Sequence, residues 1–211
     1  MKKHRSFVIE GIFFCFFLLL AGCASSELTD IWRDSSFRDP SLNKMLVISA
    51  SKNSVHRRIW EDAFSVELSK HDVVATPSYR LFPDALPDTN QVIQIVRSNG
   101  FDGVLITRWL PSETNLEYSQ GYLAQEQDRY SWRRYGFVPY YRDVWHDGSV
   151  VDSQKVDIRV IDVWATRNGE RLVWSATSKT PEPNSAQEVR PNIAKLVLSE
   201  LTRQGIIGSV R

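Results

Sequence analysis

The run KMLVISA at residues 44–50 is short, apolar and rich in β-forming residues, so it predicts a buried strand. Residues 54–71 follow, with an apolar face at helical spacing that consists of Val55, Ile59, Ala63, Phe64 and Leu68. Residues 72–76 (DVVAT) predict a second strand, which Pro77 ends. A strand, a helix and a strand in this order predict a right-handed crossover between parallel strands.

The same order is repeated once before residue 110. Asp88 and Gln91 have the spacing of a capping box. They predict the start of a helix that ends at Asn99-Gly100, since glycine is a common C-terminal cap. Residues 101–110 (FDGVLITRWL) are nearly all apolar and predict a third buried strand. Two consecutive crossovers predict a parallel core sheet.

The second half of the chain has a different pattern. Residues 154–165 alternate, with Val156, Ile158 and Val160 on one side, which predicts a strand. An Asn-Gly pair at 168–169 predicts a hairpin turn into a returning strand at 171–179. A C-terminal helix is predicted to end near Gly205 and to bury one face, formed by Ile193, Leu196, Val197 and Leu201.

These elements predict the α/β fold class, in the order β-α-β-α-β, an insertion at residues 111–153, then β-β-α, with helices packed on a mixed sheet. We expect one domain over residues 44–211.

The N-terminus has the three parts of an export signal. A basic start is followed by a nearly apolar run at residues 11–20 and then by Ala21-Gly22-Cys23. The run is too short to span a membrane, and Glu10 interrupts it. The site resembles the lipobox of bacterial lipoproteins. This resemblance implies that residues 1–22 are a signal peptide and that Cys23 is acylated.

The resemblance also implies a location. Ala24 stands where an Asp commonly retains such lipoproteins at the inner membrane. We therefore expect the outer membrane, with the domain facing the periplasm. Residues 23–43 are polar and mixed, and they are predicted to be a lipidated tether.

Charge and cysteine content exclude some classes of function. Without residues 1–22, 23 of the 26 basic and 24 of the 25 acidic residues remain. A net charge near −1 does not favour nucleic acid as a partner. Cys15 leaves with the signal and Cys23 is the lipid site, so the domain has no thiol for a disulfide or metal site.

No pattern of residues indicates catalysis. The chain has no G-x-S-x-G elbow and no known metal-binding motif. His56, His71 and His146 are expected at the surface. Asp143, His146 and Asp147 fit no metal template. We expect no enzyme activity, no cofactor and no bound metal.

The insertion is the unusual segment, because residues 111–153 hold nine of the 24 aromatic residues. Arginines are interleaved with them, and Tyr, Trp and Arg dominate protein-binding hot spots. One interpretation is a partner-binding surface formed by Tyr130, Trp132, Arg133, Arg134, Tyr135, Tyr140, Tyr141 and Trp145. The alternative is a long loop whose aromatics fold back as a second core or extend the hairpin.

Residues 156–174 (VDIRVIDVWATRNGERLVW) resemble the signature of a family of small bacterial outer-membrane lipoproteins of unknown function. The matching residues are Ile161, Asp162, Thr166, Gly169, Leu172, Val173 and Trp174, and the similarity extends over about residues 40–207. Trp164-Ala165 departs from the shorter approach that the family has to the turn. The element order is also similar to the TolB N-terminal domain and to periplasmic lipoproteins of the curli-channel and penicillin-binding-protein-activator type.

Physical reasoning assigns the residues of this hairpin a structural role rather than a functional one. Leu172, Trp174 and Ala176 alternate along the strand, which predicts that Trp174 lies in the core. Asp162 is expected to end its strand or support the turn.

Together these observations predict a lipid-anchored periplasmic binding or assembly protein that contacts an envelope protein or peptidoglycan through the insertion. Two alternatives stay open. One is a structural subunit that forms homo-oligomers by pairing sheet edges. The other is an envelope hydrolase that uses His146 and nearby acids.

Overall fold

The computed structural model describes residues 26–110, 156–181 and 186–208. They form one six-stranded sheet in the order β1-β6-β5-β4-β2-β3. The strands are β1 (Glu27–Arg33), β2 (Lys44–Ser49), β3 (Val74–Pro77), β4 (Gly103–Leu110), β5 (Val156–Ala165) and β6 (Arg171–Pro181). The helices are α2 (Ser54–Ser69), α3 (Thr89–Asn99) and α7 (Ala186–Arg203), with a 3₁₀ turn at Ser78–Arg80.

The sheet is mixed, as the sequence predicts. β2 pairs in parallel with both β3 and β4, which confirms the parallel core expected from the two crossover units. β5 pairs antiparallel with β4 and with β6, and β1 adds to β6 as an antiparallel edge strand. The α/β fold class is therefore confirmed.

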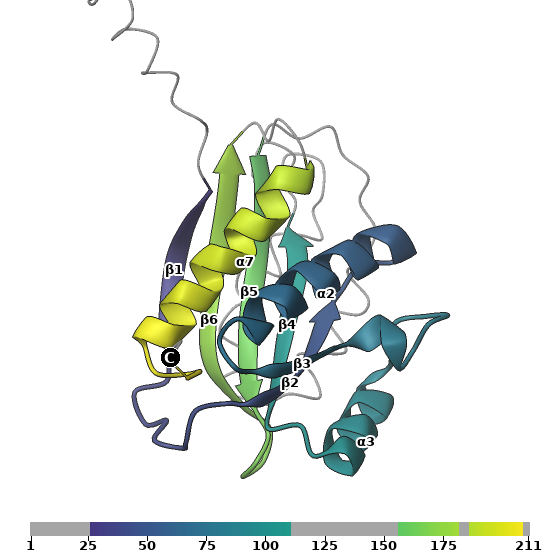
Figure 1. Cartoon of the computed structure of the whole chain (residues 1–211), viewed down its shortest axis with the longest axis vertical. Coiled ribbons are helices and arrows are strands. Elements are labelled where there is room, and N and C mark those ends of the chain that lie inside the picture. The colour runs from purple at the N-terminus through teal and green to yellow at the C-terminus, as the bar shows by residue number, and fades with distance from the viewer. Residues whose placement is uncertain (1–25, 111–155, 182–185, 209–211) are drawn as a thin grey trace, which may run out of the picture.

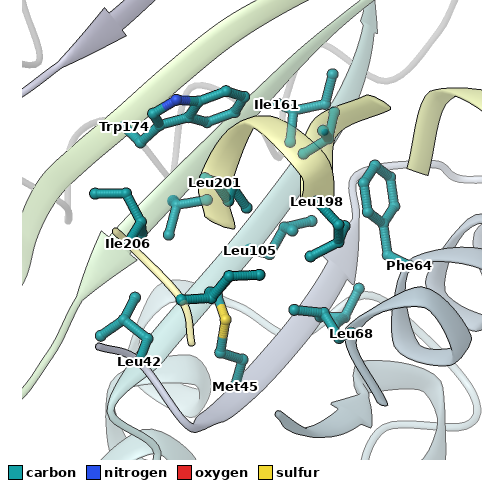
Figure 2. Packing of buried hydrophobic residues seen from close by; sticks show 14 of the residues in the cluster. Leu42, Met45, Phe64, Leu68, Leu105, Ile161, Trp174, Leu198, Leu201 and Ile206 are labelled. Atoms are coloured by element: carbon teal, nitrogen blue, oxygen red, sulfur yellow. The ribbon is translucent and has the colours of Figure 1, made fainter. Parts of the chain in front are cut away.

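Helices cover both faces of the sheet, and each face has its own core. α2 and α7 lie side by side on one face, where they bury the larger hydrophobic cluster (Figures 1 and 2). Trp174 of β6, Leu105 of β4 and Phe64 of α2 belong to it. α3 packs on the other face, where Val92 and Val96 contact a second cluster that includes Trp164.

The N-terminal boundary of the domain is not where the sequence suggests. Part of the predicted tether, residues 23–43, is an integral part of the sheet, because β1 pairs with β6. Phe37 and Leu42, which follow β1 in the sequence, are buried in the larger core. β1 is hard to recognise as a strand in the sequence, because its pairing with β6 is irregular between Thr29 and Trp32. Asp30, between these two residues, has a positive φ of 51°.

The buried face of α2 is also rotated from the predicted one. Phe64 and Leu68 are buried as expected, but Val55 and Ile59 are 59% and 37% exposed. The buried positions near the start of the helix are instead Arg57, Trp60 and Glu61. A periodicity that counts only apolar residues misses this face, because two of its members are charged.

The β5–β6 hairpin confirms one expectation and corrects another. Trp174 is fully buried, as predicted. Leu172 does not share its face, because the register shifts from Val163↔Trp174 to Trp164↔Leu172 and leaves Val173 as an extra residue. Such a bulge changes the alternation of side chains. Leu172 therefore packs in the second core, while Val173 and Trp174 lie in the first.

Two predicted helix ends agree with the structure, and one predicted helix face differs in part. Asp88 and Gln91 form the capping box of α3, and Gly100 ends the helix with a left-handed φ of 61°. In α7, Ile193, Val197 and Leu201 are buried, whereas Leu196 is 37% exposed.

Candidate functional site

The residues predicted to bind a partner lie outside the described part of the chain. This holds for Tyr130, Trp132, Arg133, Arg134, Tyr135, Tyr140, Tyr141 and Trp145, and also for Cys23 and His146. What the structure describes is where the insertion leaves and rejoins the fold. Leu110 at the end of β4 pairs with Ile158 near the start of β5, so both connections lie at one end of the sheet.

This end is also where the parallel strands finish, and open α/β sheets bind ligands there when the chain reverses direction across the sheet. β2 is the point of reversal, because α2 follows it on one face and α3 precedes β4 on the other. The ends of β2 and β4 are joined by a hydrogen bond from the Ala50 amide to the Thr107 carbonyl, 2.8 Å. A ligand site is therefore expected at this edge of the sheet.

The Glu61 carboxylate is the centre of a buried polar network at the end of β2. Its Oε1 accepts hydrogen bonds from the Ser49 amide (3.1 Å), Arg57 Nε (3.1 Å) and Ser78 Oγ (2.6 Å). Its Oε2 accepts one from the Tyr79 amide at 2.8 Å. Glu61 is fully buried, and a buried carboxylate needs such donors to offset the loss of water.

Arg57, one helical turn earlier, extends this network to the segment that follows β3 in the sequence. Its guanidinium donates to the Phe82 and Ala85 carbonyls (2.9 and 2.7 Å) and to Ser78 Oγ (2.8 Å). α2, the end of β2 and residues 78–85 are thereby held together. Both oxygens of Glu61 are already engaged, so we assign this network a structural role.

A second charged cluster lies on the α2/α7 face, close to where the insertion rejoins the fold. The Arg159 guanidinium stands 3.8 Å from the centre of the Trp60 ring, a cation–π contact. Burial lowers the pKa of Arg159 to about 10, while the neighbouring Asp157 opposes this shift and Arg190 adds to it. Arg159 Nε lies 3.1 Å from Asp157 Oδ1.

Arg190 of α7 completes this cluster, with its guanidinium 5.9 Å from the Trp60 ring. Burial lowers the pKa of Arg190 too, and Asp157 partly opposes the effect. The buried Nε atoms of Arg159 and Arg190 have no hydrogen-bond acceptor in the described structure, although the former faces Asp157 across the ion pair. Among the described side chains, the cluster therefore holds two guanidinium groups against one carboxylate.

The sequence gives little sign of either cluster. Arg57 and Glu61 have the i, i+4 spacing of an ordinary helical ion pair, which is usually exposed. In the alternating sequence of β5, Arg159 occupies a polar position, which predicts an exposed side chain. Its burial depends on α2 and α7, which are distant in sequence.

The residues of the family-like hairpin have structural partners. Thr166 Oγ1 donates to the Phe101 carbonyl at 2.6 Å, and Arg167 contacts the Asp102 carboxylate at 2.6 Å. Asp162 does not end its strand as expected, because β5 continues to Ala165. It is buried within β5, where its backbone is opposite Ile106 and Ser175.

The two histidines in the described ranges occupy ordinary positions. His56 is exposed in the first turn of α2. His71 Nδ1 lies 2.9 Å from Thr202 Oγ1 and joins the end of α2 to α7. Among the described residues, no group of three or more His, Cys, Asp or Glu side chains is placed to hold a metal ion. No helix within these ranges combines the length and apolarity needed to cross a membrane.

Comparison with known proteins adds a distant structural likeness. No protein-family model matches the chain, and no curated protein matches it. A substituted form of PelC from Paraburkholderia phytofirmans, a dodecamer, is 16% identical with a TM-score of 0.42, over 84% of this chain and 98% of that chain. The PelC dodecamer in another crystal form is also 16% identical, with a TM-score of 0.40, over 83% of this chain and 97% of that chain. A likeness this distant says nothing about function, and the resemblance to the lipoprotein family stays a prediction.

Proposed function

We propose that the chain is a lipid-anchored binding protein of the bacterial outer membrane, acylated at Cys23, which holds an envelope partner through its insertion. One observation supports this most directly. Segment 111–155 connects two strands that are paired up to Leu110↔Ile158 and packed in cores on both faces of the sheet. Loops on a rigid sheet commonly carry function, because the scaffold positions them.

The chemistry of the insertion favours binding over catalysis. Tyr and Trp give a large contact area at a low cost in conformational entropy, and Arg adds directional polar contacts. The segment is rich in all three. The partner is an envelope protein or a polymer such as peptidoglycan.

Crosslinking in intact cells tests the proposal. A photoreactive residue at Trp132, Tyr135 or Tyr141 is expected to capture one discrete partner, and the same group at Asn168, in the turn at the other end of the hairpin, is not. Equal capture at both ends would contradict a partner surface in the insertion.

A deletion variant separates the insertion from its scaffold. A flexible linker that joins Leu110 to Gln154 keeps the β4–β5 connection, so the domain is expected to fold and stay anchored but to lose its partner. A domain that folds and keeps full cellular function would show that the partner site lies elsewhere. A domain that no longer folds would show that the aromatic residues form a second core.

A second candidate function is an oligomerising structural subunit, and one observation favours it. The six-stranded sheet leaves β1 and β3 as its two edge strands, and edge strands can pair with another chain. Light scattering on the mature protein in detergent distinguishes the two, since edge pairing requires a stable oligomer without any other partner.

A further inference from the structure

The segment that would tether the domain to its anchor is much shorter than the sequence suggests. β1 begins at Glu27, four residues after Cys23. A fully extended chain of this length spans at most about 14 Å. The N-terminal end of β1 therefore stays close to the membrane surface once Cys23 is acylated.

The domain is longer than this tether. β6 has 11 residues, which correspond to about 36 Å of strand. Glu27 pairs with Lys179 near the end of β6, and Ser26 Oγ lies 2.7 Å from Thr180 Oγ1. The tether is too short to pass along the domain, so the domain cannot stand with its Arg171 end on the membrane and its Glu27 end away from it.

We define the anchor end as Glu27, Asp157, Lys179, Thr180 and Arg190. Strand pairing joins the first four across β1, β6 and β5, because Glu27 is opposite Lys179 and Asp157 is opposite Thr180. Figure 1 shows the start of β1, the tip of β6 and the start of α7 at this end, and the C-terminus at the other. Leu110 and Ile158 lie in line with Lys179 across the sheet, so the insertion leaves from the anchor end as well.

Charges of both signs lie at the anchor end. Lys179 is half-buried and stands opposite Glu27 of β1. Arg159 and Arg190 lie just inside this end and are buried, and Arg159 is paired with Asp157. Charge therefore does not select this surface, and the orientation rests on the length of the tether.

From the length of the tether, we infer that the anchor end faces the bilayer that holds the acyl chains. This inference rests on the proposed acylation of Cys23. It also narrows the proposed function, because both connections to the insertion then lie close to the membrane surface.

Two single-cysteine variants of the mature lipoprotein test the orientation. Asn192→Cys is exposed on α7 two residues after Arg190, and Asn168→Cys is exposed in the distant β5–β6 turn. Cys23 is blocked by its lipid, so a fluorophore labels only the introduced thiol. In vesicles of phosphatidylethanolamine and phosphatidylglycerol with a headgroup-attached nitroxide quencher, we expect several-fold stronger quenching at residue 192 than at residue 168. Equal quenching would overturn the inference.

A long-tether variant tests whether the length of the tether sets the orientation. About 20 Gly/Ser residues inserted after Ala24 have a root-mean-square span of about 25 Å, which frees the domain to turn. The difference between residues 192 and 168 should then shrink toward zero. A difference that stays undiminished would overturn the inference, because something other than the tether would orient the domain.

Mass analysis of the N-terminal peptide distinguishes failure of the inference from failure of the proposed function. An unmodified Cys23 would overturn both. An acylated Cys23 with equal quenching at the two positions would overturn the orientation and leave the anchor in place.

Discussion

The guanidinium of Arg159 lies 3.8 Å from the centre of the Trp60 ring, which places a charged strand residue against an aromatic helix residue inside the core. Cation–π contacts gain strength when they are desolvated. Arg190 lies nearby, and in the described part of the chain both guanidinium groups neighbour the carboxylate of Asp157. The stability of the domain and its dependence on pH should therefore be sensitive to this cluster.

Removal of the carboxylate should be more harmful than removal of the central cation. Asp157→Asn removes the carboxylate that the described residues place beside Arg159 and Arg190, so we expect a loss of about 2 kcal/mol in the free energy of unfolding. This is less than the ~3–5 kcal/mol of a fully buried pair, because the Asp157 side chain is 21% exposed. Arg159→Met is the matched control and should cost less, since it removes a buried charge and keeps an apolar stem over Trp60. Urea denaturation measures both, and the reverse order would contradict this account of the cluster.

The same cluster predicts a pH dependence of opposite sign to that of alkaline denaturation. Burial lowers the folded-state pKa of Arg159 to about 10, below its value in the unfolded chain. Above that pH the unfolded state binds more protons than the folded state at this group, so its contribution to stability rises with pH. The difference in unfolding free energy between the native protein and Arg159→Met should therefore move in favour of the native protein as the pH rises through about 10. A difference that does not change across that pH would contradict the assignment.

Glu61 should be far more sensitive to substitution than the other buried glutamate of the same helix. Its two oxygens accept four hydrogen bonds, and Glu61→Gln replaces one acceptor with a donor that faces other donors. We expect a loss of ~3 kcal/mol, in the range for breaking a buried ion pair, and faster hydrogen exchange at the Tyr79 amide. Glu67→Gln is the control, because the Glu67 carboxylate pairs with the exposed Lys70, and it should cost under ~1 kcal/mol.

Local signals in the sequence predict local structure well in this chain. The capping box at Asp88 and the glycine at residue 100 fix the ends of α3 through backbone geometry that depends on a few neighbouring residues. The short apolar runs locate β2 and β4, because strands buried on both faces are apolar throughout. The parallel order then follows from the crossovers.

The features that the sequence misses all depend on distant contacts. Arg57 and Glu61 can be buried only because Ser78, Phe82 and Ala85 satisfy them. β1 has few apolar residues of its own and is held by β6, about 150 residues later. The bulge at Val173 moves Leu172 to the second core, and a strict alternation cannot show it. Of the candidate site, the partner surface of the insertion stays a prediction, because its residues lie outside the described ranges, and neither buried charge cluster was predicted.

The hairpin tryptophan should be a major contributor to the core. Trp174 is fully buried in the larger cluster, where Figure 2 shows it above Leu201 and Ile206. Trp174→Ala is expected to cost ~3–5 kcal/mol, the typical loss for truncation of a buried tryptophan. Val66→Ala, on an exposed position of α2, should change stability by less than ~0.5 kcal/mol. Thermal unfolding measures both, and an unchanged melting temperature for Trp174→Ala would argue for a functional role instead.

The N-terminal segment should be part of the folding unit, which distinguishes the structure from a tethered domain that begins at Lys44. A chain that starts at Lys44 loses β1, which covers the free edge of β6, and also loses Phe37 and Leu42 from the larger core. Burial of a phenylalanine and a leucine contributes about 1.5–3 kcal/mol each, so this loss is comparable to the whole stability of a small domain. We expect the shortened chain to be unfolded or aggregated by circular dichroism and size-exclusion chromatography.

The control is a chain that starts at Ser26, which keeps β1 and the Ser26–Thr180 contact and should fold like the mature protein. If the chain from Lys44 folds with an unchanged melting temperature, β1 is an accessory strand. The tether from Cys23 to the core is then long enough for the domain to turn over, and the orientation inferred from its length no longer holds.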